Sequence, residues 1–171
     1  GERELAQDCL RALAVIFSQL DGAQSISQAY EQRALPSYQK LLYLQLADLY
    51  LAQERYGDSA ETLKSYLRRF PDSTEAPRVQ LRVIESYRAG GFAGLVAQEK
   101  LLYLQRFAIG GQYWQGIGDT ERAGISNYLK QFTGELANYH HALAQQQAAP
   151  GGKPAAAREH YLAAIIYYRA F

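Results

Sequence analysis

The sequence has little cysteine, little net charge and no long apolar run. Cys9 is the only cysteine among 171 residues, so the chain cannot form an internal disulfide. The formal net charge of +1 is too small to favour binding to nucleic acid or to a membrane surface. No stretch of about 18 apolar residues occurs, so we expect no membrane-spanning segment. Cysteine usage leaves the redox compartment of the protein open.

Motifs of the common catalytic and metal sites are also missing. The adjacent His140 and His141 would point about 100° apart on a helix, unlike the four-residue pairs of helical zinc sites. His160 would approach them if the last helix packs on the long helix before it. No Gly-x-Ser-x-Gly elbow and no Gly-Lys-Ser/Thr phosphate loop occur. We therefore expect no enzyme activity, no catalytic residue, no metal site and no cofactor.

Helix-forming residues fill most of the chain. Alanine, leucine and glutamine are abundant and β-branched residues are few, which predicts an all-α fold. The first helix is predicted over 2–20, with Cys9 buried in its apolar stripe. That stripe consists of Leu5, Cys9, Leu13, Ile16 and Leu20. Ser25 is predicted to cap a short helix that ends near residue 33, and Pro36 fits the first turn of the next helix.

Residues 41–71 predict two amphipathic helices joined by a tight turn. One face of the first helix carries apolar residues at three- and four-residue steps, namely Tyr43, Leu46, Ala47 and Tyr50. Ala47 and Ser59 are small, and we expect the two helices to cross closely there. Pro71 ends the second helix, because proline lacks the N–H donor that a helix interior needs. After it, Asp72-Ser73-Thr74 offers caps for a new helix.

The pattern of 41–71 returns further along the chain. Tyr66-Leu67-Arg68-Arg69-Phe70 recurs as Tyr103-Leu104-Gln105-Arg106-Phe107, about 37 residues later. Internal similarity at a fixed spacing is typical of helical solenoids. The second unit is degenerate, because Gln80 stands where Tyr43 stood and no proline closes the unit.

These motifs resemble a tetratricopeptide repeat (TPR), which spans about 34 residues. The resemblance rests on the large aromatic, the small residue, the turn, Tyr56-x-x-Ser59-Ala60 and the closing Pro71. It implies an all-α, TPR-like right-handed helical solenoid of antiparallel helix pairs. The expected parts are N-terminal helices (1–35), repeat 1 (36–71), degenerate repeat 2 (72–108), and a long helix plus partial repeat 3 (119–171). The run 56–91 also resembles bacterial cell-envelope TPR proteins, such as the lipoprotein of the outer-membrane β-barrel assembly machinery.

The C-terminal third predicts a loop and two helices. In the loop 110–118, we expect Tyr113 and Trp114 to hold the loop over the core rather than to form a recognition patch. A long helix is predicted over 120–147, and a last helix from residue 155. The preferred alignment of that last helix matches Tyr161 with Tyr56, and the competing one matches Tyr167 with Tyr66. In either case we expect the sequence to be a piece of a longer array.

The TPR resemblance implies a binding function. The first helices of TPR pairs line a concave groove that binds peptides or partner domains, which implies a non-enzymatic scaffold for protein–protein interaction. The residues predicted to bind the partner are Leu44, Asp48, Leu51, Arg78, Leu81, Arg82, Glu85 and Arg88. The expected partner is a protein or peptide, with no nucleic acid and no small-molecule cofactor. Membrane association would come only through a segment before residue 1 or through a partner.

Two alternatives to the scaffold function stay open. The chain can be a structural spacer or capping module of a larger multi-domain protein, or an accessory subunit of an envelope export system. The resemblance to envelope proteins implies a location on the periplasmic side of the bacterial cell envelope. The cytoplasm is the alternative location.

Overall fold

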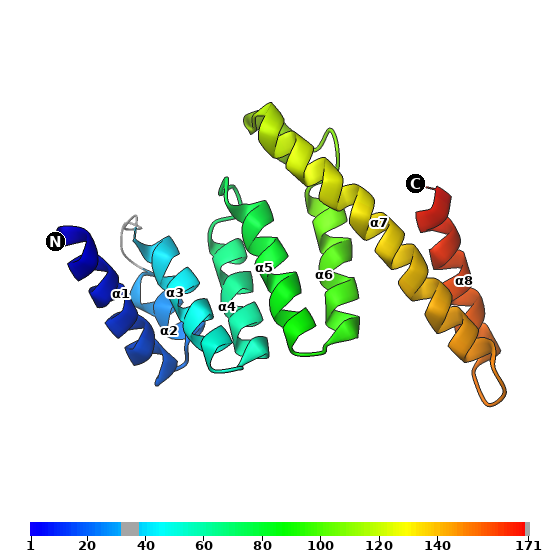
Figure 1. The fold of residues 1–171 in the computed structure, drawn as a ribbon, viewed down its shortest axis with the longest axis horizontal. Coiled ribbons are helices and arrows are strands. Elements are labelled where there is room, and N and C mark those ends of the chain that lie inside the picture. The colour runs from blue at the N-terminus through cyan, green and yellow to red at the C-terminus, as the bar shows by residue number, and fades with distance from the viewer. Residues whose placement is uncertain (32–37, 170–171) are drawn as a thin grey trace. The chain divides into compact units, whose positions relative to one another are not determined.

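The chain folds into helices joined by short connections. The computed structural model describes residues 1–31 and 38–169, and no β-strand occurs within them (Figure 1). The α-helices are α1 (Glu2–Ser18), α2 (Ala23–Ala29), α3 (Gln39–Ala52), α4 (Tyr56–Arg69), α5 (Ala76–Ala89), α6 (Ala93–Arg106), α7 (Asp119–Ala148) and α8 (Pro154–Arg169), with a 3-10 helix η1 (Gln112–Gly116). The predicted all-α class is confirmed.

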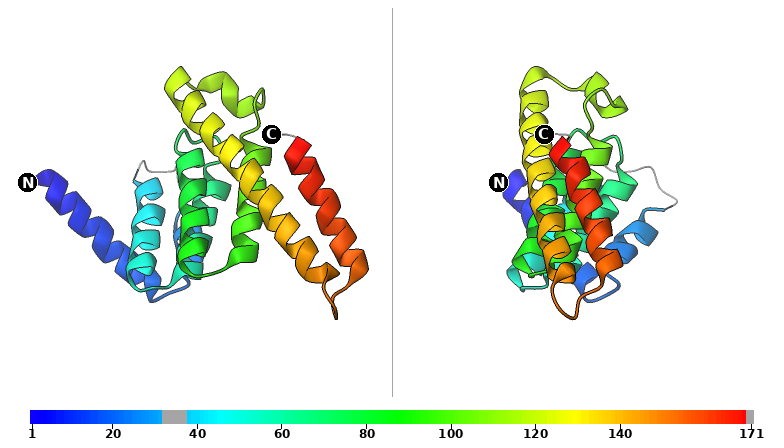
Figure 2. Two further views of the ribbon diagram at one scale, coloured as in Figure 1. Left: turned by 45° about the vertical axis from the view of Figure 1, so that its right-hand side comes forward. Right: turned by 90° about the vertical axis from the view of Figure 1, so that its right-hand side faces the viewer.

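Two compact units divide the chain, and each is described by itself. Unit 1 is Gly1–Val96 and unit 2 is Ala97–Phe171, so the division falls inside α6. In unit 1, α4 packs against both α3 and α5, and the three helices lie side by side with alternating direction (Figure 2). Their shared core is closed to solvent and consists of Leu42, Tyr43, Leu46, Ala47, Ala60, Leu63, Tyr66, Val83 and Ile84.

A close helix crossing joins α3 to α4. Ala47 is 0% exposed and Ser59 is 1% exposed. The Ser59 hydroxyl donates a hydrogen bond of 2.9 Å to the carbonyl oxygen of Ala47, which requires the two backbones to approach closely. The Ser59 hydroxyl also lies 3.2 Å from that of Ser86 on α5. The predicted crossing at Ala47 and Ser59 is therefore confirmed, and it extends to the third helix.

The connection from α4 to α5 is held by Ser73. The Tyr66 hydroxyl lies 2.9 Å from the Ser73 hydroxyl, and both side chains are buried. The backbone N–H of Glu75 donates to the Ser73 hydroxyl oxygen at 3.3 Å. The prediction that residues 72–74 cap α5 is wrong in detail, because Glu75 occupies the N-cap and makes no side-chain cap. Ser73 instead ties the turn to the end of α4.

The first helix presents a different face to the core than its sequence predicts. Cys9 is exposed, and so are Leu5, Ile16 and Leu20 of the predicted stripe. The most buried residue of α1 is Ala14, at 1% exposure, and α1 packs on α3. The predicted burial of Cys9 is therefore wrong. Apolar residues occupy more than one side of α1, and the smaller side chain of Ala14 allows the closer approach to α3.

The short helix α2 starts earlier than predicted. It begins at Ala23 with Gly22 at the N-cap, so Ser25 lies inside the first turn and does not cap the helix. The Ser25 hydroxyl instead accepts a hydrogen bond of 3.1 Å from the backbone N–H of Asp21. The predicted helix end near residue 33 and the predicted place of Pro36 lie outside the described residues.

Unit 2 is built around a long helical hairpin. Helix α8 packs against the C-terminal half of α7, and residues 149–153 join the two helices (Figure 1). The ring of Tyr103 on α6 packs edge-on against Phe132 on α7, with 5.3 Å between ring centroids. The predicted long helix is confirmed, and it continues through Gly134 without a break.

The loop before α7 is held down by its aromatic residues. The Trp114 indole N–H donates a hydrogen bond of 2.8 Å to the carbonyl oxygen of Phe107. The ring of Tyr113 lies edge-on to that of Phe107, with 5.0 Å between centroids. Phe107 itself is fully buried. These contacts confirm the expectation that Tyr113 and Trp114 hold the loop over the core.

The last helix contradicts the preferred alignment of the C-terminal segment. Helix α4 begins at Tyr56, whereas α8 begins at Pro154 and contains Tyr161 in its interior. The alignment that places Tyr161 at a helix start is therefore wrong. The competing alignment, which matches Tyr167 with Tyr66, puts Ala157 opposite Tyr56 and agrees better with the observed start of α8.

The close crossing of α3 and α4 makes a testable prediction. We expect Ala47→Leu to reduce the free energy of unfolding by about 1–3 kcal/mol, because the added methyl groups have no space at the crossing. Urea unfolding followed by circular dichroism measures this loss. Ala52→Leu, at the exposed end of the same helix, is the control and should change stability by at most about 0.5 kcal/mol. Equal stability of both variants would contradict the crossing.

Candidate binding surface

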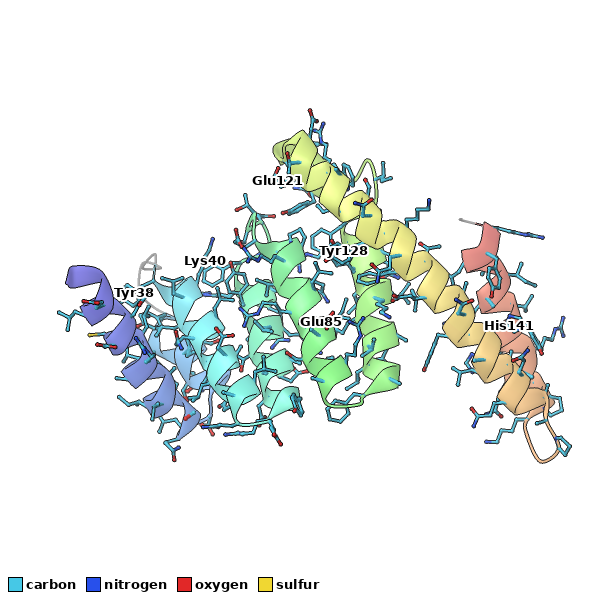
Figure 3. The ribbon with its side chains drawn as sticks, viewed as in Figure 1. Tyr38, Lys40, Glu85, Glu121, Tyr128 and His141 are labelled. Carbon is cyan, nitrogen blue, oxygen red and sulfur yellow. The ribbon has the colours of Figure 1, made fainter. Side chains whose placement is uncertain are left out.

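The residues predicted to bind a partner lie on two helices of unit 1. Leu44, Asp48 and Leu51 are on α3, and Arg78, Leu81, Arg82, Glu85 and Arg88 are on α5. Figure 3 shows the position of Glu85 on α5. We call the surface formed by these eight residues the α3/α5 face. All eight side chains are exposed or half-buried, so each of them is accessible to a partner.

An ion pair between helices fixes the centre of the α3/α5 face. The guanidinium group of Arg82 on α5 donates to the carboxylate of Asp48 on α3. Both side chains are accessible to solvent, so the pair contributes little to folding stability. It does connect α3 to α5 directly across the face, because its two members come from different elements. Arg82 and Asp48 therefore satisfy each other within the chain.

The other two arginines of the α3/α5 face differ in how closely each one pairs with a carboxylate of the chain. Arg88 pairs with Glu85, one turn earlier on the same helix. Arg78 lies 4.0 Å from the carboxylate of Glu75, at the limit of an ion pair, and its side chain is 82% exposed. Arg78 is therefore the arginine most available to a partner. The face as a whole carries mixed charge rather than a positive field.

Leucines supply the apolar part of the same surface. Leu51 is 40% exposed, and Leu41, in the same row of α3, is 49% exposed. Leu44 and Leu81 are half-buried, so each shows part of its side chain to solvent. Exposed leucines beside paired charges form a surface that can bury apolar side chains of a partner and orient them through polar groups.

Helix α1 continues the pattern of α3, which the sequence analysis missed. Its inward residues Leu10, Leu13, Ala14 and Phe17 have the same spacing as Tyr43, Leu46, Ala47 and Tyr50 on α3. When Ala14 is matched with Ala47, Val15 corresponds to Asp48, and Val15 is 48% exposed. The signal was available in the repeated Leu-Ala pair at residues 13–14 and 46–47. The larger apolar residues of α1 obscured it.

A partly buried hydrogen bond connects α4 to α5. The Tyr87 hydroxyl donates to the Glu61 carboxylate at 2.7 Å. Burial and the adjacent Glu61 charge raise the pKa of Tyr87 to about 12. Burial opposes ionisation of Glu61, but hydrogen bonds from Tyr87 and Lys64 outweigh burial and lower the pKa of the carboxyl. Glu61 is therefore ionised at neutral pH and holds Tyr87 in place.

Unit 2 brings two of the histidines together. The Nδ1 atoms of His140 on α7 and His160 on α8 are 3.1 Å apart, so one donates and the other accepts. The ring of His140 also stacks on Tyr167, with 5.7 Å between centroids. His141 faces Tyr168 instead, with its Nδ1 atom 3.3 Å from the hydroxyl (Figure 3 labels His141). The expected approach of His160 is confirmed, and it joins His140 alone.

Within residues 1–31 and 38–169, no three histidine, cysteine or acidic side chains gather closely enough to hold a metal ion. None of the helices described here combines the length and the apolar character needed to cross a bilayer.

Comparison of the chain with models of known protein families, with curated proteins and with solved structures gave no match.

Because of the histidine pair, we expect the free energy of unfolding to depend on pH. Burial, and then the neighbouring His160, lower the pKa of His140 below its usual value. The unfolded chain therefore binds more protons than the folded chain as pH falls below about 6.5, so stability decreases in that range. Urea unfolding at pH 7.5 and pH 5.5 measures this decrease. We expect His140→Gln to reduce the difference and His141→Gln to preserve it. A wild-type stability that rises on acidification would contradict the prediction.

Proposed function

We propose that unit 1 is a TPR-like solenoid that binds a peptide segment of a partner protein on the α3/α5 face. Four features support the solenoid form. The helices α3, α4 and α5 have equal length, 14 residues each. Short connections join them in an antiparallel order, and small residues meet at the crossing of α3 with α4. The inward face of α3 also repeats on α1. A repeated unit that stacks on its neighbours is the structural basis of solenoids.

The exposed leucines of the α3/α5 face are the observation that carries the binding function. Leu41 and Leu51 lie in one row on α3, and half-buried Leu81 lies on α5 beside the arginines. An isolated exposed leucine needs no explanation, but a group of them across two helices favours an interaction surface. Arg78, which is nearly free in solvent, can pair with an acidic residue of the partner. The proposed ligand is therefore a segment with apolar anchors and at least one acidic residue.

The proposed setting follows from the resemblance to envelope TPR proteins. In that setting, the chain is a non-enzymatic scaffold on the periplasmic side of the bacterial envelope, with a protein or peptide as its partner. It uses no cofactor and binds no nucleic acid. Only the sequence motifs of 56–91 support this location.

A structural spacer is the second candidate function. The pairing of Arg82 with Asp48 and of Arg88 with Glu85 favours it, because charges satisfied within the chain need no partner. A spacer would hold neighbouring domains apart and would have no ligand of its own. The two functions differ in whether the α3/α5 face selects a defined peptide sequence.

Selection from a displayed peptide library separates the two functions. We expect the full chain to select peptides that share spaced apolar residues and an acidic residue. For one selected peptide, Arg78→Gln combined with Arg88→Gln should weaken binding more than tenfold, because two of the three arginines on α5 are lost. Fluorescence anisotropy of the labelled peptide measures the change.

A second pair of arginines provides the matched control. Arg68→Gln combined with Arg69→Gln, on α4, removes the same charge at a distance from the α3/α5 face, and peptide affinity should stay within about twofold. A larger loss from the α4 pair would show that binding uses another surface. Failure to select any common peptide would support the spacer.

A further inference from the structure

We propose that Arg68 and Arg69 bind a phosphate group in a hollow between α2 and α4, apart from the α3/α5 face. The hollow has a volume of about 400 Å³. The described residues that line it are polar or cationic, namely Gln24, Ser27, Ser65, Arg68 and Arg69. The first two come from α2 and the other three from α4, so the packing of the two helices creates the site.

The two guanidinium groups lack an ionic partner. Among the side chains that the structure describes, no carboxylate lies within ion-pair distance of Arg68 or Arg69, although other arginines of unit 1 are paired in this way. The segment 32–37, Gln-Arg-Ala-Leu-Pro-Ser, contains no acidic residue. The charge of Glu61 acts on Arg68 from beyond ion-pair distance. Two adjacent cations repel each other, and an anion in the hollow would reduce that repulsion.

One donor of a lining residue has no partner. The Nε–H group of Arg69 is buried and has no hydrogen-bond partner in the described part of the chain. An Nη atom of Arg69 reaches the carbonyl oxygen of Tyr30 only at 3.5 Å. A buried and unsatisfied donor is costly, because its bond to water has been lost without a replacement. Because almost no surface of this Nε atom is open to solvent, a phosphate oxygen in the hollow would reach it only after the Arg69 side chain turns toward the hollow.

The two serine hydroxyls of the hollow already donate hydrogen bonds within the chain, so they are not free to donate to a ligand. Ser27 donates to the carbonyl oxygen of Ala23 at 3.0 Å, and Ser65 donates to that of Glu61 at 3.0 Å. Ser65 also accepts a hydrogen bond of 2.8 Å from Arg68, which holds that guanidinium in place. The donors left for a ligand are therefore the guanidinium N–H groups and the amide of Gln24.

These donors fit a phosphate group better than a carboxylate. The phosphate group carries nearly two negative charges at neutral pH and three acceptor oxygens, which match two guanidinium groups. A hollow of about 400 Å³ exceeds the roughly 30 Å³ that one water occupies by a wide margin, so it also holds the group to which a phosphate is attached. The ligand class is therefore free phosphate or a phosphate monoester.

Titration of the full chain with inorganic phosphate tests the site. At constant ionic strength, maintained with sodium chloride, phosphate should raise the melting temperature and shift the backbone amide signals of Gln24 and Ser65. Arg68→Gln combined with Arg69→Gln should weaken phosphate binding more than tenfold. Arg78→Gln combined with Arg88→Gln removes the same charge from α5 and should leave phosphate affinity within about twofold. Selection of peptides by the α3/α5 face is measured separately, so either proposal can fail alone.

Three outcomes would overturn the phosphate site. The first is that phosphate and chloride act equally at the same ionic strength. The second is that both arginine pairs lose phosphate affinity to the same degree, which would show a general effect of charge. The third is that acetate binds as tightly as phosphate. If the double variant does not fold, Arg68→Gln alone, at an exposed position, should still weaken binding at least threefold.

Blocked phosphoserine identifies the source of the phosphate. Tighter binding of phosphoserine than of inorganic phosphate would support a phosphorylated protein as the ligand, because the remaining volume of the hollow would then be used. Equal binding of the two compounds would support a free phosphate ion. Both results would support a phosphate site at Arg68 and Arg69.

Discussion

The packing of unit 1 depends on one buried polar contact, the hydrogen bond from Ser59 to the carbonyl oxygen of Ala47. The two small residues bring α3 and α4 close enough for this bond, and the Ser59 hydroxyl also lies near Ser86 on α5. A buried hydroxyl must find partners, so the bond allows little sliding of the three helices. The surfaces on both sides of α4 inherit their geometry from this contact.

The arginines of the α3/α5 face and those of the hollow between α2 and α4 differ in whether they pair with carboxylates of the chain. On the α3/α5 face, Arg82 and Arg88 have carboxylate partners within the chain, and the leucines offer the main gain to a ligand. In the hollow between α2 and α4, Arg68 and Arg69 have none among the described side chains. Satisfied charges orient a partner, whereas unsatisfied charges attract a counter-ion. The two surfaces therefore suit different ligands.

The sequence predicted the parts of the fold in which one pattern dominates. The end of α4 follows from Pro71, and the crossing at Ala47 follows from regular spacing. The position of Trp114 follows from the tendency of the indole N–H group to form a hydrogen bond when the ring packs on a core. The prediction that Cys9 is buried was wrong, because α1 carries apolar residues on more than one side. Periodicity marks an apolar side, but packing selects which of several sides is covered.

The sequence by itself determined that the chain is helical, where most helices begin and end, and which residues lie on one side of α3 or on one side of α5. These are local properties, set by steric limits on the backbone and by the spacing of apolar residues. Only the tertiary structure decided the inward side of α1, the pairing of Asp48 with Arg82, the choice of His140 rather than His141 as the partner of His160, and the hollow that gathers Gln24 with Arg69. Each of these joins residues from different helices, and the distance between helices depends on side-chain packing that no single segment encodes.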